Sequence, residues 1–185
     1  MMRTLVLFLE EPSAQAMLEG LLPRVLPPGV ELRFIVFEGK QDLEKQLVRR
    51  LSLWLAPNSL FVVLRDQDSG DCRETKRRLT AKCVSAGRDG ALVRIACHEL
   101  ESWYLGDLAA VESAFGQRGL ARLALKAKFR KPDVLGSPST ELEKLTRGQY
   151  QKVDGSRKLG PLLNLKTNLS RSFQVFLEGI IRLTA

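Results

Sequence analysis

The sequence is poor in the residues on which several common kinds of catalytic site depend. It contains one histidine, His98, so a Ser-His-Asp or Cys-His nucleophilic site would have to use that residue. Its three cysteines, Cys72, Cys83 and Cys97, lack CxxC spacing and cannot all be paired. We therefore expect no structural zinc site, and a reducing cytoplasmic location fits the cysteine content best.

Long apolar runs and nucleotide-binding loops are also missing. The longest apolar stretches, such as residues 60–64, are too short to span a bilayer, and no small-residue cleavage site follows the N-terminal apolar run. Neither GxxxxGK[ST] nor GxGxxG is present, so we expect no ATP hydrolysis by this chain. The 6% aromatic content leaves few side chains for stacking on single strands. The sequence thus predicts no membrane partner and no ATPase activity.

Positive charge is concentrated in the last third of the chain. Residues 1–119 contain sixteen Lys/Arg and sixteen Asp/Glu, whereas residues 120–185 contain thirteen and five, so the net charge of +8 lies entirely there. Such an excess is what binding of DNA or RNA backbone requires, although a solvated basic face without a partner has the same composition. The candidate nucleic-acid-binding residues are Lys126, Lys128, Arg130, Lys131, Lys152, Arg157 and Lys158.

The last three of these bases lie around a Gly-Ser pair that we expect to form a turn after Tyr150. Backbone N–H groups in such a turn, with cations nearby, could hold a phosphate. A surface loop with incidental charge is an equal alternative.

Strand-like and helix-like patterns alternate along the first 117 residues. The 185 residues, 44% hydrophobic and 27% charged, are enough for a sizeable core. Since strand–helix alternation favours parallel pairing, we predict an α/β fold with a parallel four-stranded sheet flanked by helices. The expected strands are residues 4–9, 31–37, 59–64 and 91–97. The expected helices are residues 12–22, 43–54, 71–86 and one that begins at His98.

After residue 117 the pattern changes to short helical stretches. Gly, Pro and Ser interrupt it at residues 136–139 and 154–156, and a final helix over residues 170–183 carries an apolar stripe. We therefore predict two parts: an α/β core over residues 1–117, and a basic, mainly helical extension over residues 118–185 that packs on the core.

Acidic residues follow three of the predicted strands. The carboxyl ends of parallel strands meet at one edge of a sheet, and sites of open sheets form there. Oxygen ligands favour Mg²⁺ or Mn²⁺ over zinc, so these acids predict a divalent-metal site, although any single one can simply be exposed. The residues are Glu10 and Glu11, Asp66 and Asp68, and Glu99 and Glu101.

The spacing of Asp66 and Asp68 has a specific consequence. On extended backbone, residues two apart face the same side, so both carboxylates can reach one ion. Asp71 follows one loop later, where it either joins them or caps the next helix with Glu74.

Glu99 and Glu101 cannot both face one site if their helix begins at His98. Residues two apart lie about 200° apart around a helix, and we favour Glu99 because it is nearer the strand end. For His98 a general-base role is conceivable, but a polar contact at the helix start is the simpler interpretation.

Two of these segments resemble the Toprim fold, the metal-binding domain of topoisomerases, primases and OLD-type (overcoming lysogenization defect) nucleases. They are LVLFLEEPSAQAMLEGLL, with Glu10 after a strand, and LFVVLRDQDSGD, with its DxD. Further segments, IACHELESWYLGD, YQKVDGSRKLGP and SRSFQVFLEGI, are similar to an uncharacterised Toprim-like bacterial family. Its members are often encoded beside an ATPase and are suspected of acting in phage defence.

The resemblance covers most of the chain and implies a Toprim/Rossmann-like fold. It implies catalytic roles for Glu10, Asp66 and Asp68 with Mg²⁺ (or Mn²⁺), in a nuclease or phosphodiester-transfer enzyme that acts on DNA or RNA and works with a separately encoded ATPase. One departure is Glu11, which stands where the family usually has glycine. The full set of candidate metal ligands is Glu10, Asp66, Asp68, Asp71, Glu99, Glu11 and Glu101.

Two other functions remain compatible with the sequence. One is a non-catalytic Toprim-like subunit that binds or scaffolds a partner. The other is a receiver-like phosphoacceptor at Asp66, which the basic last third does not support.

Overall fold

Within residues 2–185, which the computed structural model describes, four parallel strands form one sheet in the order β2-β1-β3-β4. The register sets Leu9 of β1 beside Val36 and Leu64, and Asp66 beside Ala96, so the carboxyl ends of the strands lie together. This confirms the predicted α/β fold, which is consistent with a Toprim/Rossmann-like arrangement. The strands are β1 (Arg3–Leu9), β2 (Val30–Val36), β3 (Ser59–Asp66) and β4 (Leu92–Ala96).

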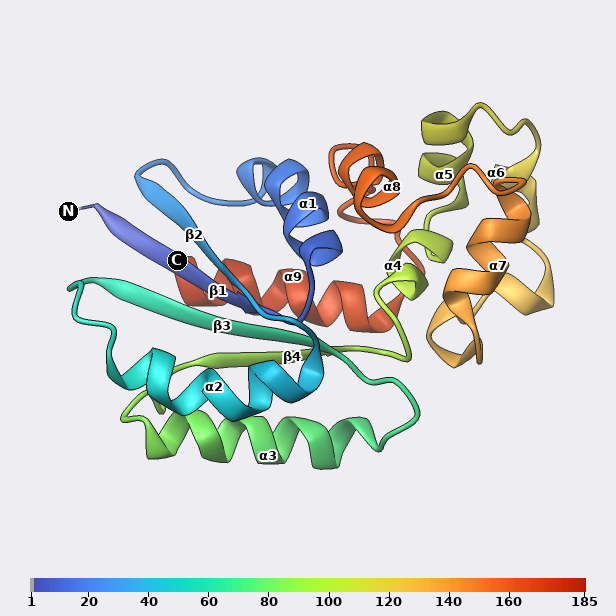
Figure 1. The fold of residues 1–185 in the computed structure, drawn as a ribbon. Coiled ribbons are helices and arrows are strands. Elements are labelled where there is room, and N and C mark those ends of the chain that lie inside the picture. The colour runs from blue at the N-terminus through green and yellow to red at the C-terminus, as the bar shows by residue number, and fades with distance from the viewer. Residues whose placement is uncertain (1) are drawn as a thin grey trace.

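Two helices, α2 (Lys40–Ser52) and α3 (Cys72–Ser85), cover one face of the sheet (Figure 1). Their apolar residues recur at helical spacing and are buried against alternate side chains of the strands, as the sequence pattern predicts. The shared core on this face includes Leu43, Leu47, Leu51, Leu79, Val6, Phe8, Phe61 and Val63.

On the other face lie α1 (Pro12–Leu21) and α9 (Arg171–Thr184), and α9 packs against β4. The apolar stripe of α9 is buried: the Phe173 and Phe176 rings lie 5.4 Å and 5.0 Å from the ring of Trp103. The last helix of the chain therefore packs against the sheet.

Shorter helices gather beyond the carboxyl ends of the strands (Figure 1). Core residues from Leu5 to Ile180 form one hydrophobic cluster, so packing continues across the predicted division at residue 117. These helices are α4 (Glu101–Leu105), α5 (Leu108–Phe115), α6 (Leu120–Leu123), α7 (Pro138–Leu145) and α8 (Lys152–Leu159), with 3₁₀ turns at Leu22–Arg24, Ala127–Phe129 and Pro132–Val134. No helix within residues 2–185 is long and apolar enough to cross a bilayer.

The expected Gly-Ser turn after Tyr150 is wrong, because residues 154–156 lie inside α8. The Gly155 N–H donates to the Gln151 carbonyl, as in any helix. A Cβ at Gly155 would collide with the Tyr150 ring, so glycine is present for close packing and not for a turn. The Gly155 N–H is therefore used by the helix, and the Gly-Ser pair does not form the turn on which the expected phosphate cradle rests.

The helix expected from His98 begins three residues later, at Glu101. His98 has a left-handed φ of 56°, and its carbonyl accepts a hydrogen bond of 2.7 Å from the Asp68 N–H. The segment between β4 and α4 is thus a turn bonded to the chain that follows β3. The later start of the helix changes which acidic residue of this segment faces the carboxyl edge of the sheet.

Candidate functional site

Glu10, directly after β1, points toward the end of β3. Its Oε2 accepts a hydrogen bond of 3.2 Å from the Asp66 N–H and lies 3.7 Å from Nε of Arg65. Burial raises the pKa of the Glu10 carboxyl, and the nearby Asp68 and Glu11 charges add to this, while the Asp66 N–H and Arg65 oppose it. Glu10 therefore joins the ends of two neighbouring strands, as the sequence pattern predicts.

Asp66, the last residue of β3, carries the most strongly perturbed carboxyl at this edge. Burial raises its pKa well above the usual range, and the charges of Glu101, Glu10 and Glu11 raise it further. A hydrogen bond from the Leu100 N–H acts in the opposite direction. Several carboxyls thus face one poorly hydrated region, where their negative charge is costly.

Glu101 begins α4 and is buried, with 1% of its surface exposed. Its Oε1 accepts a hydrogen bond of 2.8 Å from the Tyr150 hydroxyl, whereas its buried Oε2 has no partner within residues 2–185. Burial raises the pKa of Glu101, and the Tyr150 hydrogen bond lowers it. Since buried polar atoms are rarely left unpaired, this free oxygen indicates a site for a further group.

Glu11, at the position where the resembled family usually has glycine, is the N-cap of α1. Its backbone is extended, with φ of −150° and ψ of 162°, so this position does not need glycine. Its carboxylate lies 3.3 Å from Nζ of Lys152 at the start of α8. The extra acid is therefore accommodated by a cation from the helical extension.

Asp68 lies beyond the end of β3, so the extended backbone on which the expectation for Asp66 and Asp68 rests does not reach Asp68. The strand ends at Asp66, and Asp68 has a left-handed φ of 56°, which Asp tolerates better than most residues. Oδ2 of Asp68 lies 2.9 Å from Nζ of Lys40 and 3.8 Å from Nη2 of Arg65. Basic side chains therefore already neutralise this carboxylate.

Arg65 is a site residue that the sequence interpretation missed. It is 6% exposed and lies between Glu10, Asp68 and Glu44 of α2, with which it forms a close ion pair. Its place in the apolar run of β3 was the available signal, because a charge in a buried strand needs partners.

Asp71 and Glu99 serve as helix caps. Oδ1 of Asp71 accepts a hydrogen bond of 2.8 Å from the Glu74 N–H, so Asp71 caps α3 and is exposed. Oε2 of Glu99 accepts one of 2.7 Å from the Ser139 N–H at the start of α7. Glu101, and not the favoured Glu99, is therefore the acid after β4 that faces Asp66.

His98 lies in a small open cavity outside the acidic cluster. The cavity, about 400 Å³, is lined by Asp68, Ser69, His98, Glu99 and Gly136. His98 therefore lies near one edge of the candidate site, and its general-base role stays a hypothesis.

The chemistry of the carboxyls fits a hard divalent cation, but their arrangement is not a preformed ligand cluster. Glu10, Asp66 and Glu101 supply only oxygen donors, and Oε2 of Glu101 is free. Within residues 2–185, however, no three His, Cys, Asp or Glu side chains are grouped as metal ligands. Binding would require these side chains to move toward one ion.

Most of the basic residues selected from the last third have partners within the fold. Arg130 donates to the Leu125 carbonyl at 3.1 Å, and Nζ of Lys158 lies 5.7 Å from the centre of the Phe115 ring. Lys126 and Lys131 form no ion pair within the described part of the chain. The ion pairs of the others are Lys128–Glu141 at 2.7 Å, Lys152–Glu11 at 3.3 Å and Arg157–Asp154 at 3.0 Å.

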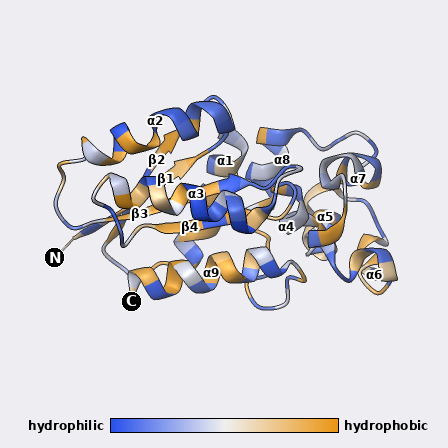
Figure 2. Cartoon of the chain, turned by 90° about the horizontal axis from the view of Figure 1, so that it is seen from below, coloured by the Kyte–Doolittle hydropathy of each residue, from blue (hydrophilic) through white to orange (hydrophobic). Residues whose placement is uncertain are grey.

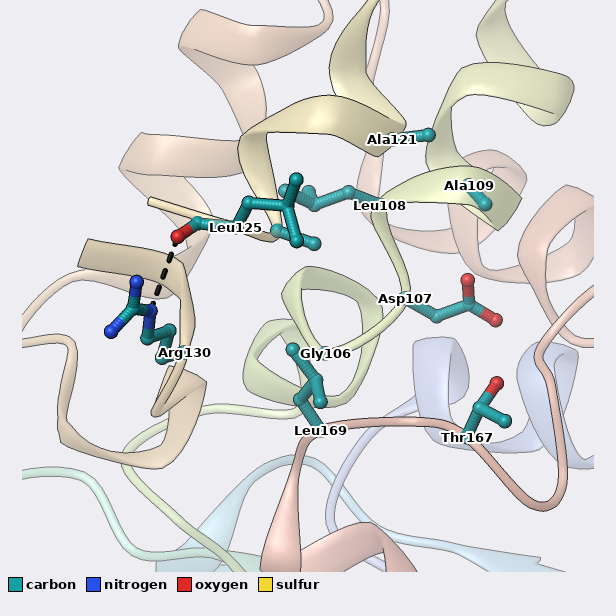
Figure 3. A pocket seen from close by; sticks show the side chains of 10 residues that line it. Gly106, Asp107, Leu108, Ala109, Ala121, Leu125, Arg130, Thr167 and Leu169 are labelled. Atoms are coloured by element: carbon teal, nitrogen blue, oxygen red, sulfur yellow. Dashed lines mark hydrogen bonds between the residues drawn. The ribbon is translucent and has the colours of Figure 1, made fainter. Parts of the chain in front are cut away.

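A second cavity, of about 450 Å³, lies between α5, α6 and the segment before α9 (Figure 3). Its polar residues maintain the fold: Asp107 caps α5 at the Ala110 N–H and accepts a hydrogen bond of 2.6 Å from the Asn164 N–H. Arg130 is bonded to the Leu125 carbonyl. Because Asp107 and Arg130 are hydrogen-bonded within the fold, they are not free to act as catalytic groups in this cavity.

Fold and site together define a parallel α/β protein with buried carboxyls at the carboxyl edge of its sheet, where open sheets form their sites. Residues 9–181 match the family described as Domain of unknown function (DUF4276), so the chain belongs to this family. None of the curated proteins matches the sequence.

A solved structure, the C-terminal region of the Burkholderia pseudomallei OLD protein, has a similar fold. The identity is 19%, the TM-score is 0.51, and the similarity covers 98% of this chain and 98% of that one. The OLD-related part of the sequence resemblance is therefore supported at the level of the fold. The Toprim assignment itself stays a prediction.

Proposed function

We propose that this protein is a Mg²⁺-dependent nuclease or phosphodiester-transfer enzyme that acts on nucleic acid. Asp66 and Glu101 would hold the ion, with Glu10 beside them, and Mn²⁺ would substitute for Mg²⁺. The likeness in fold to part of an OLD protein supports this class of function.

One observation carries the proposal: the buried Glu101 carboxyl has one oxygen without a partner within residues 2–185, and the charges of Glu101 and Glu10 act on the half-buried Asp66 carboxyl. Like charges in a poorly hydrated place are destabilising unless they are protonated or neutralised by a cation. A divalent ion would satisfy the free oxygen and remove the repulsion at once. A purely structural cluster would be expected to pair all three acids with Arg or Lys, as happens at Asp68, but only Glu10 has such a partner, Arg65, and Asp66 and Glu101 form no ion pair within residues 2–185.

The chain's own residues would hold and orient the reacting groups. When bound, Mg²⁺ would polarise a phosphoryl oxygen and lower the pKa of an attacking water. Glu10, whose pKa is raised by burial, can keep a proton at a higher pH than a free glutamate, which suits transfer to or from an oxygen of the substrate. Tyr150, bonded to Glu101, fixes the position of that carboxyl.

The test compares cleavage by the unmodified protein with cleavage by Asp66→Asn and Glu101→Gln. Supercoiled plasmid and single-stranded RNA serve as substrates, with Mg²⁺, Mn²⁺ or EDTA. We expect metal-dependent cleavage to fall at least about a hundredfold in both variants, because each loses a charged ligand.

Asp89→Asn is the matched control. Asp89 is exposed in the loop before β4, at the opposite end of the strands, and the same substitution there should leave cleavage unchanged. Full activity in both Asp66→Asn and Glu101→Gln, with folding verified by circular dichroism, would refute the proposal.

A second candidate function is a non-catalytic binding or scaffolding subunit. The pairing of Asp68 with Lys40 and Arg65 favours it, because this carboxylate needs no metal. Calorimetric titration with Mn²⁺ separates the two: a scaffold takes up no metal that depends on Asp66, whereas the enzyme does.

The biological setting extends the proposal to phage defence in the cytoplasm, with a separately encoded ATPase as partner. The chain has no phosphate-binding loop of its own, so any ATP-driven step would need such a partner. Co-expression with an adjacently encoded ATPase, followed by size-exclusion chromatography, tests for the complex. Separate elution of the two proteins at micromolar concentrations would contradict the proposed partnership with the ATPase.

A further inference from the structure

A basic groove runs along the open edge of the sheet, between α3 and α9. It has a volume of about 480 Å³, and its floor includes Ile95 of β4 and Val175 of α9. β4 is the edge strand and contacts both helices. Figure 2 views the molecule from the side of α3, which is largely hydrophilic, with β4 and α9 next to it.

The groove carries positive charge that the fold leaves unneutralised. Arg73 and Lys76 of α3 are exposed and, with Arg94 of β4, form no ion pair within residues 2–185. Arg171 of α9 adds a fourth cation, which Glu178 pairs at 3.3 Å. The half-buried Arg94 also donates hydrogen bonds of 3.2 Å and 2.8 Å to two backbone carbonyls, so Arg73 and Lys76 are the free cations of the groove.

The one carboxylate in the groove is already engaged. Oδ1 of Asp133 accepts hydrogen bonds from the Ser170 and Ser172 hydroxyls at 2.6 Å and 3.2 Å, and Oδ2 accepts one of 2.7 Å from the Ser172 N–H. Asp133 thus holds the start of α9 and makes no ion pair with the four cations. An anion that enters the groove would meet Arg73 and Lys76, which form no ion pair within residues 2–185.

The groove leads to the edge of the candidate active site. Cys97 lines it and precedes His98, which lies with Asp68 in the neighbouring cavity. Cys72 lines it from the other side and directly follows Asp71 in the loop after β3. A chain of phosphates lying in the groove would therefore reach the carboxyl end of the sheet.

We infer that this groove binds the phosphate backbone of the nucleic acid, and that Arg73 and Lys76 are its main contacts, with Arg94 adding positive charge at the floor. The inference deepens the proposed function, on which it rests, by placing the substrate along α3 and β4 instead of along the bases from Lys126 to Lys131. Neither an aromatic ring nor a free acceptor lines the groove, so it recognises charge and not base sequence.

The test is binding of a fluorescein-labelled DNA duplex to the full chain, followed by fluorescence anisotropy in EDTA at several salt concentrations. We expect the Arg73→Gln/Lys76→Gln double variant to bind on the order of tenfold more weakly at about 0.1 M salt. The slope of log affinity against log salt should also fall by about 2, because two phosphate contacts are lost.

Two double variants serve as controls for the loss of two charges. Arg33→Gln/Arg49→Gln removes exposed cations that form no ion pair with any described residue, from β2 at the other edge of the sheet and from α2, and should bind as the unmodified chain does. Lys126→Gln/Lys131→Gln removes two bases of the last third that form no ion pair within residues 2–185, and should have the smaller effect. A larger loss in this variant than in the groove variant would overturn the inference.

Cysteine labelling tests the same inference on the unmodified protein. Cys72 lines the groove, Cys83 is buried, and burial raises the pKa of Cys97 to about 11, so a maleimide should label Cys72 first. The duplex should slow this labelling, whereas unchanged labelling at saturating duplex would contradict the inference.

The nature of the partner is tested by competition. If polyglutamate displaces the duplex with the same affinity and salt slope, the groove is a general site for acidic chains, and the nucleic-acid assignment is wrong. If the duplex binds through the groove but is never cleaved with Mg²⁺, the proposed enzyme fails while this inference holds. If the chain binds no duplex at low salt, the inference itself is refuted.

Discussion

At the scale of single residues, Asp66 is the side chain on which the account depends. Its position after the apolar run of β3 was predictable from the sequence, as was its proximity to Glu10. The role of Glu101 was not, because it depends on where α4 begins. Since His98 adopts a left-handed turn, the helix starts later than its sequence suggests, and Glu101 replaces Glu99 beside Asp66.

The raised pKa values of Asp66, Glu10 and Glu101 predict how stability depends on pH. Because folding raises these pKa values, their contribution to stability is present when they are protonated and is lost as pH rises through the raised values. Asp66→Asn removes one such charge. We therefore expect it to raise the melting temperature of the metal-free protein more at about pH 8 than at about pH 5.

Mg²⁺ should produce the complementary effect. A ligand that binds only the folded state stabilises it, so Mg²⁺ should raise the melting temperature of the unmodified protein at about pH 8 and have little effect on Asp66→Asn. Differential scanning fluorimetry measures both shifts, with Asp89→Asn as the control. Equal Mg²⁺ shifts in Asp66→Asn and Asp89→Asn would show that the ion binds elsewhere.

At the scale of elements, sequence periodicity located the strands and the long helices of the sheet layers. The predicted and observed elements agree there because each has one buried face and is followed by residues that end a helix or strand. It failed at α8, where glycine and serine suggested a turn. Glycine is required in that helix by close packing against Tyr150, a contact between separate segments that local pattern cannot reveal.

Contact between α1 and α8 gives a prediction at this scale. A Cβ at Gly160 would collide with the Met17 backbone of α1, which cannot move as a flexible side chain could. Gly160→Ala should therefore lower the free energy of unfolding by about 1–3 kcal/mol. Gly136→Ala, where no atom lies within 4 Å of an added Cβ, is the control in chemical denaturation. Equal stability of the two variants would contradict this packing.

At the scale of the whole molecule, the cations that the fold leaves unpaired do not follow the distribution of net charge along the sequence. The excess of +8 belongs to residues 120–185, yet several of these cations are paired, such as Lys152 with Glu11. Arg73 and Lys76, from the part of the chain with no net charge, remain unpaired within the described residues. Counting charges along a sequence cannot show this, because pairing depends on which elements the fold brings together.

The most direct test of the central claim is the anomalous scattering of crystals soaked in Mn²⁺. The account predicts an anomalous peak in contact with the carboxylates of Asp66 and Glu101, which disappears in Asp66→Asn crystals. A well-ordered site without such a peak, in which Glu101 is paired with protein groups alone, would contradict it.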